Sequence, residues 1–273
     1  MTGPVPGAAI ELVVHPDEGT LVVLTAGRLL AALLDAQAAR GTVHLVVTGG
    51  GVGTALLQAV GDHPARDALD WHQVQVWWGD ERFVAADDAD RNDRGARAAL
   101  FDRVPAHLHP MAALAGEPGG STRQSAAEPS DRSSAPSAGG PPTAPDLDAA
   151  AAAYTVALRS AAGGAVPAFD VLLLGVGPEG HCGSLFPHSA GVRERSAPVV
   201  GVADSPKPPP ARVTLTLPAM QRARQVWVIA SGAEKADTAA RAVAGATPDD
   251  LPVAGARGTE RTLWLVDRAA AGG

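Results

Sequence analysis

Short apolar segments bounded by turn residues recur along the chain and predict strands. We expect strands at residues 10–14, 43–47, 74–78, 169–174, 197–202, 213–217, 226–230 and 262–266. Several of these segments are apolar at consecutive positions rather than at alternate ones. That pattern is typical of strands covered on both faces by helices, as in a parallel sheet.

Helix-like segments lie between these strands. Residues 20–40 carry one apolar stripe at helical spacing, formed by Val22, Ala26, Leu29, Leu30 and Leu33. Comparable amphipathic segments occupy residues 92–103, 148–161 and 233–243. The alternation of strands with helices predicts a three-layer α/β fold, in which helices flank a mostly parallel sheet. We expect one domain over residues 1–273.

Residues 116–145 interrupt this pattern. They consist almost entirely of Gly, Ser, Pro and Ala with scattered charges. So few apolar side chains cannot offset the conformational entropy that is lost when a segment becomes ordered. We therefore expect a flexible surface insertion. A domain linker is the alternative, but the strands predicted on its two sides look like parts of one sheet, which favours an insertion within one domain.

The composition argues against several classes of protein. The formal net charge of −7 disfavours nucleic acid as a partner, because binding to a phosphate backbone requires concentrated Lys and Arg. Cys182 is the only cysteine of the sequence, which excludes an intrachain disulfide and a cysteine-rich metal site. Residues 1–7 lack the features of a signal peptide, and the longest apolar runs are too short to span a bilayer. We expect a cytoplasmic protein without a membrane partner.

The strongest candidate for chemistry is the run GVGPEGHCGSLFPH, from Gly175 to His188, directly after a predicted strand. Its glycines permit a sharp turn, and open α/β sheets bind ligands beyond the carboxyl ends of their strands. The run places one imidazole, His181, among backbone donors. Histidine is suited to proton transfer near neutral pH. Taken alone, the run fits equally well a glycine-rich turn with an incidental histidine.

Two further segments bring polar groups to the ends of predicted strands. Thr48-Gly49-Gly50-Gly51 opens a helix, and the amides at a helix N-terminus suit a phosphate group. The segment lacks the Lys of a nucleotide P-loop and the spacing of a dinucleotide fingerprint. Asp80-Glu81-Arg82 follows the strand at 74–78. In isolation such a triplet is usually a solvated turn, but its place after a buried strand favours a ligand.

A proline-rich segment supplies two more basic residues. Residues 205–217 read SPKPPPARVTLTL, in which prolines stiffen the chain that presents Lys207. A charge-assisted bond from such a residue to a phosphate contributes about 1.5–3 kcal/mol. Arg212 in the same segment either joins the site or pairs locally within an edge loop.

These four segments together resemble the 6-phosphogluconolactonase family. That family commonly has G-x-G-x-D-G-H-x-A-S-L-F-P where this chain has residues 175–187, with Glu179 here in place of Asp and Gly183 in place of Ala. It also has a strand followed by G-D-E-R and an Asn, a Gly-Gly-Ser-Thr turn in which Gly51 here replaces Ser, and a Lys-Pro-Pro…Arg segment. The motifs occur in the same order, and the resemblance covers the chain outside the low-complexity segment.

The resemblance implies the fold of the sugar-phosphate isomerase and deaminase group. It also implies hydrolysis of 6-phospho-D-glucono-1,5-lactone to 6-phosphogluconate in the pentose phosphate pathway. His181 would act as general base and acid, with Glu179 and Asp80 as the other catalytic residues. The residues that would bind substrate are Gly49, Gly50, Gly51, Arg82, Asn92, Lys207 and Arg212. The implied partner is a small phosphorylated sugar lactone, with no metal or organic cofactor and with the protein as a monomer or homodimer.

Two other functions remain open on the sequence. The first is an amino-sugar-phosphate isomerase or deaminase on the same fold, which would release ammonia from glucosamine 6-phosphate. The second is a non-catalytic module that binds a sugar phosphate. The GHxxSLFP run and the Lys-Pro-Pro segment favour the lactone hydrolase over the first. The retained His181 argues against the second, which the Glu179 and Gly51 departures keep open.

Overall fold

The computed structural model describes residues 7–114 and 142–273, and the predicted strands and helices are present with ends shifted by a few residues, beside several short elements that were not predicted. The strands are β1 (Ile10–His15), β2 (Val43–Val47), β3 (Val74–Trp78), β4 (Asp80–Arg82), β5 (His107–His109), β6 (Val171–Gly175), β7 (Val199–Val202), β8 (Arg212–Leu215), β9 (Gln225–Ala230) and β10 (Arg261–Asp267). The helices are α1 (Glu18–Arg40), α2 (Gly50–Asp62), α3 (Asn92–Ala99), α4 (Ala144–Ala161), α5 (Ala190–Arg193), α6 (Leu217–Met220), α7 (Ala236–Val243) and α8 (Pro252–Gly255).

Seven strands form one parallel sheet in the order β1-β10-β9-β6-β2-β3-β5. The order reverses between β6 and β2, so the chain leaves these two neighbouring strands in different directions. Ligands of open α/β sheets bind at such a reversal, beyond the carboxyl ends of the strands. The topology therefore marks the loops after β2 and β6 as the place to look for a site.

A second, three-stranded antiparallel sheet has the order β4-β8-β7. The predicted strands at 197–202 and 213–217 belong to this sheet and not to the parallel one. Their partner β4 was not predicted, because it has three residues and all of them are charged. Through β4, the chain passes from the parallel sheet into the small sheet directly after β3.

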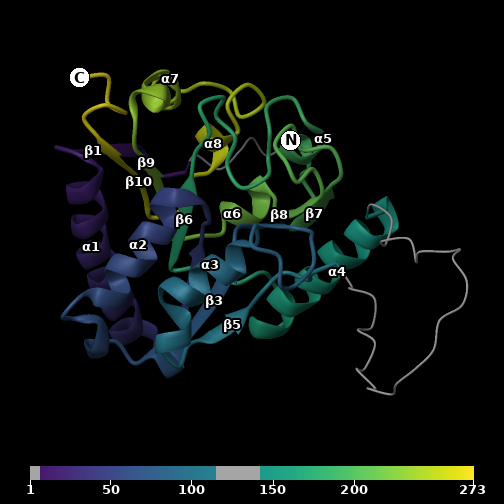
Figure 1. Cartoon of the computed structure of the whole chain (residues 1–273), viewed down its shortest axis with the longest axis horizontal. Coiled ribbons are helices and arrows are strands. Elements are labelled where there is room, and N and C mark those ends of the chain that lie inside the picture. Colours follow the sequence, from purple (N-terminus) through teal and green to yellow (C-terminus); the bar gives the residue numbers. More distant parts are fainter. Residues whose placement is uncertain (1–6, 115–141) are drawn as a thin grey trace, which may run out of the picture.

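Helices cover both faces of the parallel sheet (Figure 1). One hydrophobic cluster joins the sheet to α1, α2 and α3, and a second joins the opposite face to α4, α6, α7 and the small sheet. Adjacent residues of β3 show the division, because Trp77 belongs to one cluster and Trp78 to the other, and both are fully buried. The predicted three-layer α/β fold is confirmed, with the antiparallel sheet as part of one outer layer. A single domain over residues 1–273 stays a prediction.

Helix α1 is the one helix in the described residues with the length and composition of a membrane span. An 18-residue window within it has a mean hydropathy of 1.6. Leu29 and Leu30 are each 1% exposed in the cluster beneath the sheet, and 44% of the window is buried. Burial of a leucine side chain contributes about 1.5–3 kcal/mol, so this packing accounts for the apolar stripe.

The predicted insertion at 116–145 lies mostly outside the described residues. Its end is corrected by α4, which begins at Ala144 and not at 148 as the sequence predicted. The carboxylate of Asp146 accepts hydrogen bonds from the backbone N–H of Thr143 at 2.9 Å and from its hydroxyl at 2.6 Å. This arrangement fixes the helix start about one turn ahead of the predicted one.

Candidate active site

Loops that follow β2, β3 and β6 meet around a small cavity of about 170 Å³. Most residues predicted for the site line it, namely Gly49, Gly50, Asp80, Arg82, Asn92, His181 and Arg212. The remaining three lie next to it, since Gly51 borders an adjoining cavity and Glu179 and Lys207 contact His181. Segments more than 100 residues apart in the sequence therefore converge at the reversal point of the sheet.

His181 lies beside a carboxylate and an ammonium group. Its Nδ1 is 2.9 Å from Glu179 Oε1. The Nζ of Lys207 is 3.1 Å from the same oxygen and 3.4 Å from His181 Nδ1. A carboxylate accepts only, so the shorter contact assigns the proton to Nδ1 and leaves the lone pair on Nε2. The ring stacks on Phe186 with 4.8 Å between centroids, which fixes its plane.

The surroundings of His181 favour the neutral imidazole. Burial and then the Lys207 ammonium hold the pKa of His181 below its ordinary value, while Glu179 opposes that shift. Burial alone would raise the pKa of Glu179, but its backbone hydrogen bond, His181 and Lys207 outweigh burial and lower that pKa. At neutral pH the pair is therefore a carboxylate and a neutral base, as proton abstraction requires.

Asp80 contacts partners other than His181. Its Oδ2 accepts a hydrogen bond from the Ser184 hydroxyl at 2.7 Å and lies 4.0 Å from the guanidinium of Arg212. The carboxylate that contacts His181 is thus Glu179, at the position where the family motif commonly has Asp. Asp80 is 7% exposed and reaches the cavity from the start of β4.

Arg212 has contacts that fit both alternatives that the sequence left open. Its Nε donates to the carbonyl of Pro209 at 3.0 Å. A terminal nitrogen donates to the carbonyls of Lys207 at 3.1 Å and Pro208 at 3.2 Å. The same guanidinium faces Asp80 and lines the cavity. Burial lowers its pKa, and the carboxylate of Asp80 opposes this effect.

Arg82, Asn92 and Gly50 line both the small cavity and an outer one of about 630 Å³, and so form the wall between them. The guanidinium of Arg82 donates to Asn92 Oδ1 and, at 2.8 Å, to the carbonyl of Asp90. The Asn92 side chain packs so closely on Gly49 that a Cβ at this glycine would lie 1.8 Å from Asn92 Oδ1. Gly51 borders the outer cavity and has open space around it.

Sequence reasoning missed three residues of the site. The Ser184 hydroxyl donates to Asp80. The Gly175 N–H donates to the Thr48 hydroxyl at 3.2 Å, and this bond links the loop after β2 to the end of β6. Glu81 lies between two predicted site residues and is 1% exposed. The resemblance placed all three inside motifs, and that position was the available signal.

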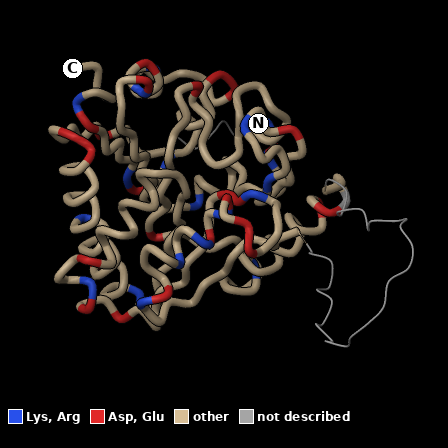
Figure 2. The backbone as a smooth tube through the Cα atoms, viewed as in Figure 1, with Lys and Arg blue, Asp and Glu red and all other residues tan. Residues whose placement is uncertain are grey.

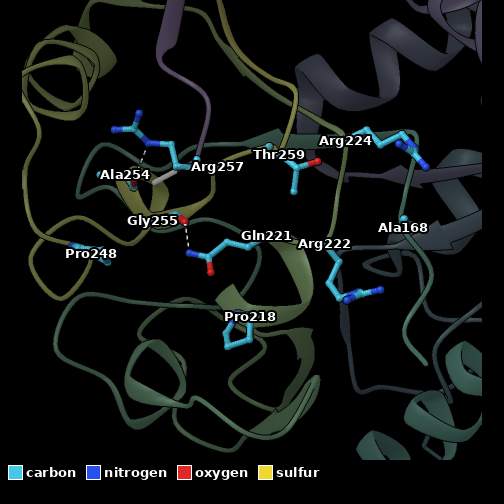
Figure 3. Close-up of a pocket in the computed structure, with 12 residues that line it drawn as sticks. Ala168, Pro218, Gln221, Arg222, Arg224, Pro248, Ala254, Gly255, Arg257 and Thr259 are labelled. Carbon is cyan, nitrogen blue, oxygen red and sulfur yellow. Dashed lines mark hydrogen bonds between the residues drawn. The ribbon is translucent and has the colours of Figure 1, made fainter. Parts of the chain in front are cut away.

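A larger cavity of about 770 Å³ lies at the opposite, amino-terminal ends of β6, β9 and β10 (Figure 3). Its charged residues are Arg222, Arg224 and Arg257, but Arg257 extends to one side and the other two extend away from it. Arg224 pairs with Glu260 at 2.6 Å. The cavity contains none of the predicted site residues, so its size does not make it the candidate active site.

The charge needed for an anionic ligand is local. Lys and Arg are interspersed with Asp and Glu along the backbone (Figure 2), while Arg82, Arg212 and Lys207 lie around the small cavity and His181. Such a cluster can attract an anion despite a negative net charge. Within residues 7–114 and 142–273, no three His, Cys, Asp or Glu side chains are grouped so as to hold a metal ion.

The parallel sheet, its reversal point and this cavity define a three-layer α/β protein with a ligand site at the carboxyl ends of its strands. Solved structures agree on the fold. A 6-phosphogluconolactonase from Trypanosoma brucei superposes with a TM-score of 0.79 at 24% identity, covering 98% of this chain and 99% of that one. A monomeric glucosamine-6-phosphate deaminase superposes with a TM-score of 0.70 at 15% identity, covering 97% and 99%.

The chain belongs to the family of glucosamine-6-phosphate isomerases and 6-phosphogluconolactonases, whose model matches residues 16–264. It is 46% identical to a 6-phosphogluconolactonase of Streptomyces coelicolor, over 96% of this chain and 93% of that protein. It is 47% identical to a 6-phosphogluconolactonase of Mycobacterium tuberculosis, over 94% and 96%. The family membership that the motifs indicated is confirmed.

Proposed function

We propose that this protein hydrolyses 6-phospho-D-glucono-1,5-lactone to 6-phosphogluconate, as a step of the pentose phosphate pathway. One observation carries the proposal: His181 is fixed through Nδ1 by Glu179, so its basic Nε2 is the nitrogen left for the cavity that it lines with Arg82 and Arg212. The names of the similar relatives support the substrate. A cytoplasmic location and a monomeric or homodimeric state are proposed with it.

Proton transfer would proceed through His181. Nε2 takes a proton from a water molecule as the water oxygen attacks the lactone carbonyl, and the imidazolium is stabilised by Glu179 at Nδ1. The tetrahedral intermediate then expels the ring oxygen, to which Nε2 returns the proton. The products are a carboxylic acid and a free hydroxyl group, and His181 is again neutral. A well-placed acid–base residue contributes about 10²–10⁴-fold to the rate.

Two backbone amides are candidates to stabilise the developing oxyanion. In the loop after β6, the N–H groups of Gly177, Gly180 and Ser184 donate to acceptors within the protein. Val176 and Gly183 also line the cavity, and their N–H groups have no acceptor within the described residues. Fixed donors at the site of developing charge are commonly the largest electrostatic contribution to such reactions.

The phosphate group would be held at the wall between the two cavities. The turn of Gly49, Gly50 and Gly51 presents the N-terminal amides of α2 there, and Arg82 is part of the same wall. Lys207 lies on the loop whose carbonyl groups Arg212 bonds, and its ammonium group would also contact the phosphate. Binding energy from the phosphate would position the lactone carbonyl for attack by water.

Hydrolysis of freshly generated 6-phosphogluconolactone tests the proposal, with spontaneous opening subtracted. We expect clear acceleration by the wild type and a loss of about 10²–10⁴-fold in kcat for His181→Ala. Folded wild-type protein that binds 6-phosphogluconate without accelerating hydrolysis would instead indicate a binding module. Release of ammonia from glucosamine 6-phosphate would indicate the deaminase alternative.

A further inference from the structure

Glu81 is a fully buried carboxylate whose oxygens are both occupied. Oε1 accepts the backbone N–H of Arg82 at 2.8 Å and of Asn92 at 2.7 Å. Oε2 accepts the backbone N–H of Asp93 at 2.8 Å. Every one of these contacts brings a donor to the carboxylate, so the ionised form fits the site. A buried charge is costly unless it is satisfied in this way.

The second partner of Glu81 is a buried arginine. A terminal nitrogen of Arg91 lies 3.8 Å from Glu81 Oε2, and both side chains are at most 3% exposed. The same nitrogen donates to the carbonyl of Met111 at 2.8 Å. Burial raises the pKa of Glu81, while Arg91 and the three N–H donors oppose that shift. The ion pair thus joins β4 to the segment that precedes α3.

Glu81 supplies the capping bonds that the N-cap residue of α3 does not make. The N-cap residue of this helix, Arg91, makes no side-chain capping bond. The first N–H groups of a helix need acceptors, and here a residue ten positions earlier, on a strand, supplies them to Asn92 and Asp93. The start of α3 is therefore positioned by β4 and not by its own sequence.

Asn92, the first residue of α3, links the start of this helix to the site. Its Nδ2 donates to the carbonyl of Asp80 at 2.9 Å, its Oδ1 accepts from Arg82, and it packs on Gly49. We propose that Glu81 is a positioning residue, which fixes Arg82 and Asn92 against the glycine turn of α2 and so shapes the part of the site that holds an anionic group. This inference rests on the proposed function for the identity of that group, the phosphate of the substrate.

Glu81→Gln tests the inference because it keeps the shape of the side chain but replaces one acceptor by a donor. We expect KM for the phosphorylated lactone to rise about 10-fold and kcat to stay within about 3-fold, since the groups affected hold substrate and do not transfer protons. The dissociation constant of inorganic phosphate, measured by calorimetry, should rise by about the same factor of 10. This second readout needs no turnover.

Asp170→Asn is the matched control. Asp170 is also a buried carboxylate, accepts the backbone N–H of His44 at 2.8 Å and pairs with Arg40 at 2.7 Å, but it lies at the amino-terminal ends of the strands. We expect it to lower Tm as Glu81→Gln does and to leave KM and phosphate affinity unchanged. A Glu81→Gln protein that loses only Tm, with KM and phosphate affinity of the wild type, would overturn the inference.

Glu81→Asp serves if Glu81→Gln fails to fold. Its carboxylate keeps the charge but is one methylene too short to reach both segments, so KM should rise about 3-fold or more at a kcat close to that of the wild type. An unchanged KM would overturn the inference. Absence of lactone hydrolysis by the wild type would instead overturn the proposed function, and phosphate calorimetry on the variants would still decide the role of Glu81.

Discussion

The hydroxyl of Tyr154 contacts the backbone of Trp78 twice. It accepts the Trp78 N–H at 2.8 Å and donates to the Trp78 carbonyl at 3.1 Å. Pairing of β3 with β5 ends one residue earlier, at Trp77. A side chain of α4 therefore makes the hydrogen bonds that a neighbouring strand would make at Trp78. Directly after this residue the chain leaves the parallel sheet for β4.

Tyr154→Phe should destabilise the protein without altering its packing. The change leaves a buried N–H and a buried C=O without their partner, so the free energy of unfolding should fall by about 1–3 kcal/mol. Thr155→Ala is the control, because the Thr155 hydroxyl donates to the Ala151 carbonyl of its own helix and to no other acceptor among the described residues. Urea unfolding of both variants checks the prediction, and equal losses in the two would contradict it.

The pH dependence of the reaction should report the environment of His181. Its pKa is lowered, chiefly by burial and then by Lys207, so kcat/KM should fall with decreasing pH only below the ordinary histidine range of about 6.5. Lys207→Met removes a neighbouring positive charge, which raises the pKa of His181 and moves the acidic limb to higher pH. Glu179→Gln should move that limb to lower pH. Identical limbs in the wild type and both variants would refute the assignment of His181 as the base.

Gly49 and Gly51 should respond differently to the same substitution. A Cβ at Gly49 would overlap the Asn92 side chain, whereas a Cβ at Gly51 meets nothing within 4 Å. Gly49→Ala should therefore raise KM about 10-fold or more by displacing Asn92. Gly51→Ala should keep KM and, as a residue of α2, add up to about 1 kcal/mol of stability. Steady-state kinetics and thermal unfolding of the pair check both statements.

The free energy of unfolding should fall in mild acid because His44 is protonated more readily in the unfolded chain. Its pKa is lowered by burial, with Asp170 opposing, and its Nδ1 accepts the indole N–H of Trp77 at 3.2 Å. A lowered folded-state pKa means that the unfolded chain binds the proton more readily. The contribution of neutral His44 to the free energy of unfolding is thus complete above the unfolded-state pKa of about 6.5. It is lost as pH falls from there through the folded-state pKa.

His44→Gln keeps an acceptor for the indole but does not titrate. Between about pH 7.5 and about pH 5, its free energy of unfolding should decline less than that of the wild type. His72→Gln, at an exposed position, should decline as the wild type does. The prediction fails if all three proteins show the same slope in urea unfolding series.

The sequence predicted the elements that carry long apolar signals and missed those that depend on distant contacts. Consecutive apolar residues identified β6 and β9, because both faces of these strands are covered. The strands β4 and β5 have three residues each and follow no hydrophobic pattern. Their pairing depends on partners far along the chain, such as Asp80 with Thr214.

The candidate site was predicted as a set of residues but not as a set of contacts. Glu179 and His181 are two positions apart, yet only their side-chain rotamers decide that Glu179 and not Asp80 meets the imidazole. The sequence placed Glu81 in a charged triplet near a ligand, but nothing in the triplet marks this carboxylate as the cap of α3. Such contacts follow from tertiary packing, which periodicity does not encode.

The bonds from Arg212 to the carbonyls of Lys207, Pro208 and Pro209 bear on the thermodynamics of ligand capture. Ordering the backbone of one residue costs about 1–2 kcal/mol in entropy. Here that loss occurs when the protein folds, since the guanidinium already holds the loop. An anion that meets Lys207 needs to immobilise little more than a lysine side chain, so more of the electrostatic attraction remains as affinity.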